Sequence, residues 1–506
     1  MNDSRARAIK LNMLAGWAAE IFAFISGLIL PRLMLTHFGS STNGLVNSIG
    51  QFLSFSVVFR AGLGGVTRAA LYKPLAEKNK KEVSSIMVAT RSYMWKVSAF
   101  VALYTFAIAI IYPFLADSEF SWDFMFTMTL IIGTGILADS LFGIKAKILL
   151  QADQKYYVPT LCSLASHICS FIISVILIKY GCSIIVVKLG AASVAFLNPL
   201  LLSIYVRKHY KLDMKVAPNN MAISQRWDAF AQQMAVVVNN SVDLVILTLF
   251  VNLREISVYT VHNMIVINIR KIVESCVTGI NSMFGDMIAK KEDETLRKTF
   301  LFIEWAFFAV CTILFSVTAI MLVPFIKLYT ANIYDVNYIR PLFAFVITLA
   351  ALMGCMKIPY QMVVEAAGRF KQTRNGAIFE VVINIAASLV LLYFFGIVGV
   401  ILGTILAAII RTMQYSFQAF KYILNIPLLH IMRNYVVYIF VFIGMCAVAT
   451  MINTSSITGW IGWVIYACIT TFFVTIIVAI ISLVNNTEQF KYLIRKILKK
   501  ENKKRI

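Results

Sequence analysis

The stretch at residues 300–328, FLFIEWAFFAVCTILFSVTAIMLVPFIKL, decides the fold class of this chain. A bilayer core of about 30 Å requires about 20 apolar residues in a helix, because each helical residue rises about 1.5 Å. Only helices and closed barrels satisfy their backbone polar groups in hydrocarbon. The stretch therefore predicts a helix that crosses a membrane.

Stretches of this kind fill the chain from end to end. Hydrophobic residues make up 60% of the sequence and charged residues 14%, and the mean hydropathy is +0.80, which leaves no room for a sizeable water-soluble domain. We predict an all-α integral membrane protein with about 14 transmembrane helices. The predicted spans are 10–34, 43–66, 92–116, 122–148, 157–178, 183–206, 229–250, 256–284, 300–328, 338–364, 376–395, 397–420, 431–453 and 459–484.

The net charge of +22 is explained by membrane topology. Lys and Arg are concentrated at the two termini and in every second gap between spans, whereas the other gaps hold few, such as Lys179 and Arg254. By the positive-inside rule the basic gaps are cytoplasmic, so both termini are predicted to be cytoplasmic, with a basic tail at 486–506. Anionic membrane lipids are the expected partners of these residues, and nucleic acid is not.

The sequence offers little that an enzyme or a metal centre would need. It contains no GxxxxGK[ST] motif, so ATP is not expected to drive this chain directly, and no cofactor is predicted. The five histidines show no metal-binding spacing, and the eight cysteines form no CxxC pair. The first span follows a basic start, as in a signal peptide, but its length and Glu20 predict a retained span.

Self-comparison indicates a duplication. Three short stretches of the first half resemble stretches of the second half at an offset of 213 or 214 residues, which predicts two six-helix lobes at 1–210 and 211–425, followed by two additional helices at 426–485. Two like-oriented bundles of this kind enclose a cleft that opens to either side in turn, as in secondary transporters. The matching stretches are 44–46 with 257–259, 76–78 with 289–291, and 154–156 with 368–370.

Basic residues inside the predicted spans are candidates for binding a substrate. A charge at a helix centre costs about 2.5 to 3.5 kcal/mol on insertion scales, so such residues usually face a cavity or a partner. Arg60 lies inside the second span, and Arg270 and Lys271 lie at the middle of the eighth, at a similar depth in the duplicated halves. Two alternatives remain open: Arg60 reaches the headgroups with its aliphatic stem in lipid, and Arg270 only neutralises Glu274 one turn away.

Polar stripes add further candidates. Asn263 shares a helical stripe with Arg270 and Glu274, and Asn239 shares one with Asp243, so these side chains are predicted to line the cleft. Glu20 and Asp243 have no basic residue one turn away that would neutralise them. These two acids, and also Glu274, are candidates for coupling transport to protons or sodium. A hydrogen-bonded structural acid is the alternative for Glu20 and for Asp243.

Two other features have structural interpretations. Asp139 shares its span with Lys145 and Lys147 and is expected to be their local partner. The GxxxG pattern of Gly399 and Gly403 predicts close helix packing rather than a phosphate-binding loop.

Two cytoplasmic loops carry a resemblance to a known family. Residues 71–78, LYKPLAEK, follow the glycine-rich end of the second span, and residues 151–156, QADQKY, separate the fourth and fifth spans. With the span count and the 6 + 6 + 2 order, the chain resembles the Wzx-type polysaccharide flippases, whose superfamily includes the MATE exporters and the lipid II flippase MurJ. The resemblance covers essentially the whole chain, and its loop motifs are silent about the sugar.

The resemblance implies a V-shaped pair of lobes in the bacterial cytoplasmic membrane. It implies a protein that moves undecaprenyl-diphosphate-linked oligosaccharide from the inner to the outer leaflet, for O-antigen, capsule or exopolysaccharide, with other polysaccharide assembly proteins as further partners. Family members are similar in having basic residues in the cavity, which implies that role for Arg60, Arg270 and Lys271. The two additional helices would form a groove for the polyprenyl tail.

Two other functions remain open. A MATE-like, cation-coupled multidrug exporter would share the fold, but its cationic drugs would prefer a cleft dominated by carboxylates. An integral-membrane enzyme, such as a polysaccharide polymerase, would need an acid, base or metal constellation at the membrane surface. The outer gaps offer little for that chemistry beyond Asp117, Glu119 and Asp123.

Overall fold

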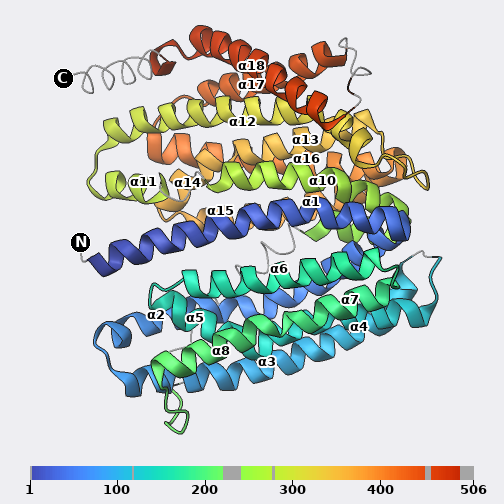
Figure 1. The fold of residues 1–506 in the computed structure, drawn as a ribbon. Coiled ribbons are helices and arrows are strands. Elements are labelled where there is room, and N and C mark those ends of the chain that lie inside the picture. Colours follow the sequence, from blue (N-terminus) through green and yellow to red (C-terminus); the bar gives the residue numbers. More distant parts are fainter. Residues whose placement is uncertain are drawn as a thin grey trace. The chain divides into compact units, whose positions relative to one another are not determined.

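The fold is known from a computed structural model that describes residues 3–116, 119–219, 221, 241–275, 280–450, 457 and 459–490. Within these ranges the chain forms helices and no strand (Figure 1). Among the described residues, ten helical segments are long and apolar enough to cross a membrane, and two further apolar helices, Ser241–Phe250 and Arg433–Ala449, are shorter. The predicted fold class, a multi-pass helical membrane protein, is confirmed.

The chain divides into two compact units. The first unit contains Met1–Ser257 and the short segment Ile333–Val336, and the second contains Val258–Asn332 and Asn337–Ile506. The helix Ser241–Phe250 belongs to the first unit. The lobe bounds expected at residues 210 and 425 stay a prediction.

The first helix, α1 (Asp3–Ser54), contains the first predicted span and the start of the second. Gly39 interrupts it with φ 79° and ψ 173°, a conformation that glycine adopts most readily. The Asp335 carboxylate accepts hydrogen bonds from the backbone N–H and the hydroxyl of Ser40, each at 2.6 Å, and so caps the second half of α1. The second span then continues through η1 (Phe55–Val57) and α2 (Val58–Ala76), ten residues beyond its predicted end at 66.

The rest of the first unit follows the predicted spans in order. A π-helical turn, η2, joins α4 to α5 within one span. The contacts place α6 against α1 and α7, and α3 against α2 and α4 (Figure 1). The elements are α3 (Lys80–Leu115), α4 (Trp122–Ala138), η2 (Asp139–Gly143), α5 (Ile144–Ala152), α6 (Tyr157–Lys179), α7 (Ile184–Ala195) and α8 (Leu197–Tyr210).

The second unit repeats this arrangement and adds two helices. Its long central helix, α12, packs against α13, α17 and α18 (Figure 1). The elements are α10 (Leu253–Ser275), which begins at the end of the first unit, α11 (Ile280–Ala289), α12 (Asp293–Tyr329), α13 (Pro341–Met356), α14 (Ile358–Ala366), α15 (Phe370–Phe395), α16 (Ile397–Ala419), the π-helical turn η4 (Phe420–Leu424), α17 (Leu428–Thr450) and α18 (Trp460–Asn485).

Backbone geometry supports the duplication independently of the sequence. Left-handed residues recur at offsets of 213 to 215: Lys78 with Lys291, Gln154 with Gly368, Gly181 with Gly396, and Lys211 with Asn425. The turns at the first two pairs also share one hydrogen-bond pattern. For example, the amide of residue 79 donates to the carbonyl of residue 74, and that of residue 292 to that of residue 287. This pattern is the Schellman turn, which closes a helix end with a left-handed residue.

Two glycines bring α15 and α16 into close contact. A Cβ on Gly403 would lie 2.5 Å from the backbone nitrogen and 2.7 Å from the Cα of Ser388, and one on Gly399 would overlap the backbone of Leu391. The predicted packing role of the GxxxG pattern is confirmed, because only glycine allows these two backbones to approach so closely.

The two additional helices are joined to the second unit by polar contacts. The Glu304 side chain on α12 is fully buried and accepts hydrogen bonds from the Tyr360 hydroxyl on α14 and, at 3.3 Å, from Asn434 on α17. The Asn434 side-chain oxygen in turn accepts a hydrogen bond from Asn485, the last residue of α18, at 3.0 Å. These contacts tie α17 and α18 to the core of the unit.

Candidate functional site

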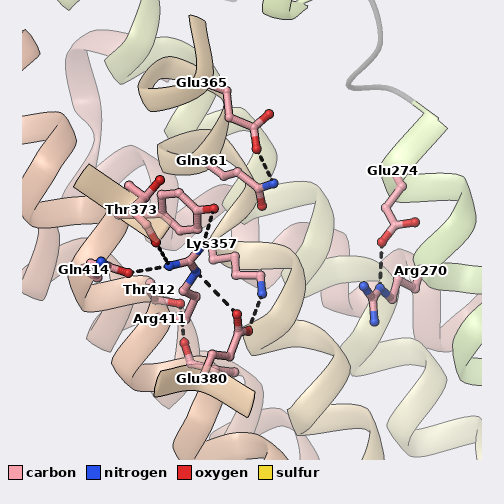
Figure 2. Close-up of polar contacts among 12 residues, drawn as sticks. Arg270, Glu274, Lys357, Gln361, Glu365, Thr373, Glu380, Arg411, Thr412 and Gln414 are labelled. Atoms are coloured by element: carbon pink, nitrogen blue, oxygen red, sulfur yellow. Dashed lines mark hydrogen bonds and ion pairs between the residues drawn. The ribbon is translucent and has the colours of Figure 1, made fainter. Parts of the chain in front are cut away.

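Three charged side chains meet inside the second unit, each from a different part of the helical bundle (Figure 2). Glu380 on α15 accepts a hydrogen bond from Lys357 Nζ at 2.9 Å, and its other oxygen lies 3.3 Å from Arg411 Nε on α16. Lys357 stands at the junction between α13 and α14. The side chains of Lys357, Glu380 and Arg411 are 17%, 11% and 7% exposed, so this triad is buried.

Arg411 is held on several sides (Figure 2). Its guanidinium donates to the backbone oxygen of Thr373 at 2.8 Å, to the side chain of Gln414 at 2.5 Å and to the hydroxyl of Tyr415 at 2.7 Å. The guanidinium carbon also lies 4.2 Å from the ring centroid of Tyr415. A planar guanidinium with these contacts is fixed in position, and most of its donors are already used.

The triad has an excess of positive charge. Burying a charge is costly unless it is paired, and here two cations share one carboxylate. The three formal charges sum to +1, and Glu365 on α14 adds a carboxylate beside them (Figure 2). Lys357 has the largest exposed fraction of the three side chains.

Arg270 and Glu274 form an ion pair on α10 (Figure 2). Arg270 Nε donates to Glu274 Oε1 at 2.7 Å, and each side chain is 43% exposed. The pairing expected as one alternative is therefore present. Because both side chains remain half exposed, the pair also leaves donor groups of the guanidinium available for a ligand. Binding of substrate by Arg270 and ion coupling by Glu274 stay predictions.

The other described candidates lie on three helices. Lys271 is exposed on α10, and Asn263 is half-buried on the same helix. Asp243 is half-buried in the helix Ser241–Phe250, where it has an interaction partner. Glu20 is exposed on α1, beside the exposed side chains of Trp17 and Ile21. Their roles as cavity or ion-coupling residues stay predictions.

Two candidates cannot be placed. The backbone of Arg60 belongs to α2, but its side chain lies outside the described residues. Asn239 lies outside the described residues altogether. The predicted match in depth between Arg60 and Arg270 stays a prediction.

Asp139 is a local partner, as expected. Lys147 Nζ lies 2.6 Å from Asp139 Oδ1, and both side chains are about one-third exposed, at 29% and 30%. The pair spans eight residues across the π-helical turn η2, which brings the two side chains together.

The triad was missed at the level of the sequence. Each of its residues lies inside a predicted span: Lys357 in 338–364, Glu380 in 376–395 and Arg411 in 397–420. Arg270 became a candidate because a charge inside a membrane span is costly, and the same argument applies to these three residues. The buried Glu304 in span 300–328 carried the same signal. Their mutual pairing could not be predicted, because it joins helices that are distant in the sequence.

Comparison with known proteins identifies the fold. No protein-family model matches the chain, and no curated protein matches its sequence. Among solved structures, the lipid II flippase MurJ in an inward closed conformation superposes with a TM-score of 0.71 at 17% identity, covering 94% of this chain and 100% of that one. A eukaryotic MATE transporter gives a TM-score of 0.56 at 14% identity, covering 82% of this chain and 96% of that one. The chain therefore has the MurJ/MATE fold.

A third neighbour bears on the polarity of the site. A transporter of the MOP superfamily from Pyrococcus furiosus superposes with a TM-score of 0.50 at 13% identity, covering 82% of this chain and 94% of that one. Its structure is described as having a binding pocket of reverse polarity, which suggests a different function for that protein. The fold alone therefore does not determine the charge of the ligand, which depends on the residues that line the pocket of each protein.

The match to MurJ reaches the additional helices of this chain. It leaves 6% of the 506 residues, about 30, unmatched, whereas α17 and α18 contain 23 and 26 residues. At least part of this helix pair is therefore matched in MurJ. The eukaryotic MATE transporter leaves 18% of the chain unmatched, which is enough to omit both helices.

Proposed function

We propose that this protein is a flippase for lipid-linked oligosaccharides. It moves undecaprenyl-diphosphate-linked repeat units of O-antigen, capsule or exopolysaccharide from the inner to the outer leaflet of a bacterial cytoplasmic membrane, by alternating access, with both termini in the cytoplasm. The observation that carries the proposal is the superposition with a lipid II flippase over 94% of the chain, including part of the pair α17 and α18.

The charges of the second unit support a diphosphate as the group that is moved. A diphosphate must leave water, and guanidinium groups offset that cost through charge-assisted, often bidentate hydrogen bonds. Arg270 offers a half-exposed guanidinium, and the buried triad adds a net charge of +1. In this proposal Arg60, Lys271, Asn263 and Asn239 also contact the substrate, and α17 and α18 hold its polyprenyl tail.

A MATE-like multidrug exporter is the second candidate, and the MATE structures among the neighbours favour it. Such a protein would couple export to protons or sodium, with Asp243, Glu20 or Glu274 as the coupling acid. A drug-susceptibility panel on a deletion strain separates the two functions, because loss of a flippase stops surface polysaccharide and leaves drug tolerance unchanged.

Transport by reconstituted protein tests the proposal directly. Proteoliposomes are loaded with a fluorescent polyprenyl-diphosphate oligosaccharide, and the fraction that reaches the opposite leaflet is followed over time. Arg270→Ala is expected to lower the initial rate by about tenfold or more, because a hydrogen bond to a charged group contributes about 1.5 to 3 kcal/mol. Arg297→Ala, which removes an exposed arginine at the start of α12, is the matched control and should keep the rate.

The double variant Arg270→Ala/Glu274→Ala distinguishes the two roles of Arg270. If the arginine only neutralises Glu274, removing both restores transport, and the substrate-binding role is wrong. If the guanidinium binds the diphosphate, the double variant stays as slow as Arg270→Ala. If the transport rate does not change with the proton gradient, the sodium gradient or the membrane voltage, the hypothesis of ion coupling through Asp243, Glu20 or Glu274 is wrong.

A further inference from the structure

A basic cavity of about 400 Å³ lies in the first unit, and none of the residues assigned above to the substrate or to ion coupling lines it. It is bounded by the N-terminal half of α3, by the η2–α5 segment and by the C-terminal end of α8 with the residues that follow it. Four of its lining residues are cationic: Arg91, Lys145, Arg207 and Lys211.

None of the described residues that line the cavity is acidic. Asp213 lies between the lining residues Leu212 and Met214, and its carboxylate accepts a hydrogen bond from the backbone N–H of Lys215 at 2.9 Å. In the part of the chain that the structure describes, none of the four cations forms an ion pair or a side-chain hydrogen bond. Four like charges around one cavity repel each other, so a bound anion would stabilise this arrangement.

The segment of the cavity lining that contains Lys211 is hydrogen-bonded to α3. The backbone N–H of Asp213 donates to Ser84 Oγ at 3.1 Å, and Ser85 Oγ donates to the backbone oxygen of Ala217 at 2.6 Å. The segment after α8 is thereby fixed onto the first turns of α3. The cavity is a formed site and not a gap beside a free chain.

An apolar stripe leads away from the cavity along α3. Trp95 lines the cavity one turn after Arg91, and Leu103, Phe106 and Ile110 follow it on the same helical face. These four side chains are 52%, 64%, 50% and 39% exposed. A tryptophan between a charged group and an apolar surface is typical of the level of the lipid headgroups in a membrane.

We propose that this cavity binds the phosphate of an anionic phospholipid. The four cations hold the phosphate by charge-assisted hydrogen bonds, Trp95 packs beside the headgroup, and the acyl chains lie along the apolar stripe of α3. The gaps that contain Arg91, Arg207 and Lys211 are the ones predicted to face the cytoplasm, so the ligand is a lipid of that leaflet. This binding site goes beyond the proposed function, and its test measures lipid binding rather than transport.

Native mass spectrometry of the full chain in detergent tests the site. The protein is titrated with phosphatidylglycerol or with phosphatidylcholine, and the lipid-bound fraction is measured for each. The variant Arg91→Gln/Arg207→Gln is expected to bind phosphatidylglycerol about 30-fold more weakly, because each cation near the membrane surface contributes about 1 kcal/mol. Phosphatidylcholine binding should be weak in all variants.

The matched control removes the same charge from the same helices. Lys96→Gln/Lys208→Gln changes two exposed cations of α3 and α8 that do not line the cavity, and it should bind phosphatidylglycerol within about twofold of the unmodified chain. Arg91→Lys/Arg207→Lys keeps both charges and should retain most of the binding, which guards against misfolding as the cause of a loss.

Three outcomes would overturn the proposal. An equal loss in the cavity pair and the control pair would mean a diffuse charge effect without a site. Equal binding of phosphatidylglycerol and phosphatidylcholine would remove the role of the anionic headgroup. Displacement of the lipid by millimolar inorganic phosphate, with loss of that effect in Arg91→Gln/Arg207→Gln, would identify a site for a soluble anion instead of a lipid.

Discussion

At the scale of single residues, Glu380 is the side chain on which the charge balance of the second unit depends. Glu380→Gln keeps the shape of the side chain but leaves Lys357 and Arg411 buried without their shared carboxylate. Removing one partner of a buried ion pair costs about 3 to 5 kcal/mol, so a clear fall in the melting temperature in detergent is expected. Thermal unfolding followed by intrinsic fluorescence measures it.

Two further variants sharpen this prediction for Glu380. Lys357→Met/Glu380→Gln removes one cation together with the anion and should recover part of the lost stability. Glu294→Gln is the control, because its pair with Lys298 is exposed and should leave the melting temperature unchanged. If Glu380→Gln melts like the unmodified chain, the triad does not stabilise the unit.

Local pairs could be predicted from the sequence, and distant ones could not. Arg270 and Glu274 are four residues apart on one helix, so their contact follows from helical geometry alone. Lys357, Glu380 and Arg411 meet only after three helical segments have packed. The spacing of these residues along the sequence does not indicate which helices pack together. A charge inside an apolar span indicates that a partner exists, but not which residue it is.

At the scale of helices, the contact between α15 and α16 depends on Gly403. Gly403→Ala places a methyl group within 3.0 Å of backbone atoms of Ser388, which cannot rotate away as a side chain could. The two helices must separate, and a lower melting temperature and a lower yield of folded protein are expected.

Gly354→Ala provides the comparison for the Gly403 variant. A Cβ on Gly354, inside α13, meets nothing within 4 Å, and alanine is the better helix former by about 1 kcal/mol. This variant should melt at the same temperature as the unmodified chain or slightly higher. An unchanged melting temperature for Gly403→Ala would show that α15 and α16 have room to adjust.

Helix existence was predicted well, whereas helix ends and breaks were not. Apolar length alone identified the spans that the structure describes, because it is the property that the bilayer selects. Most of the predicted span 229–250 lies outside the described residues. The break at Gly39 and the continuation of the second span to Ala76 depend on turns and on the contact between Ser40 and Asp335, which hydropathy does not record. The π-helical turns η2 and η4 had no signal in the sequence analysis.

At the scale of the whole molecule, the duplication predicts which turns can be improved. Gln154 and Gly368 occupy equivalent left-handed positions, with φ 62° and 69°, but only the second half has glycine there. A left-handed conformation costs a residue with a Cβ about 1 to 2 kcal/mol, so Gln154→Gly should raise the melting temperature. Gly368→Ala should lower it, and changes of equal sign in the two variants would contradict this prediction.

The duplication itself could be recovered from three short sequence matches, whereas the lobe bounds expected from them stay a prediction. The matches locate equivalent turns, and the left-handed residues at the same offsets give them a structural meaning. The helix Ser241–Phe250 lies in the first unit, and its sequence position alone does not indicate that packing.

The Schellman turns also affect how the chain enters the membrane during synthesis. The turn at Lys78 leaves only Glu77, Lys78 and Asn79 between α2 and α3, and the turn at Lys291 is equally short. Because only three residues separate the helices, we expect the second helix of each pair to reverse direction as soon as it emerges from the translocon. We expect each pair to insert as one hairpin, so an epitope tag inserted at these turns would interfere with biogenesis before any transport step takes place.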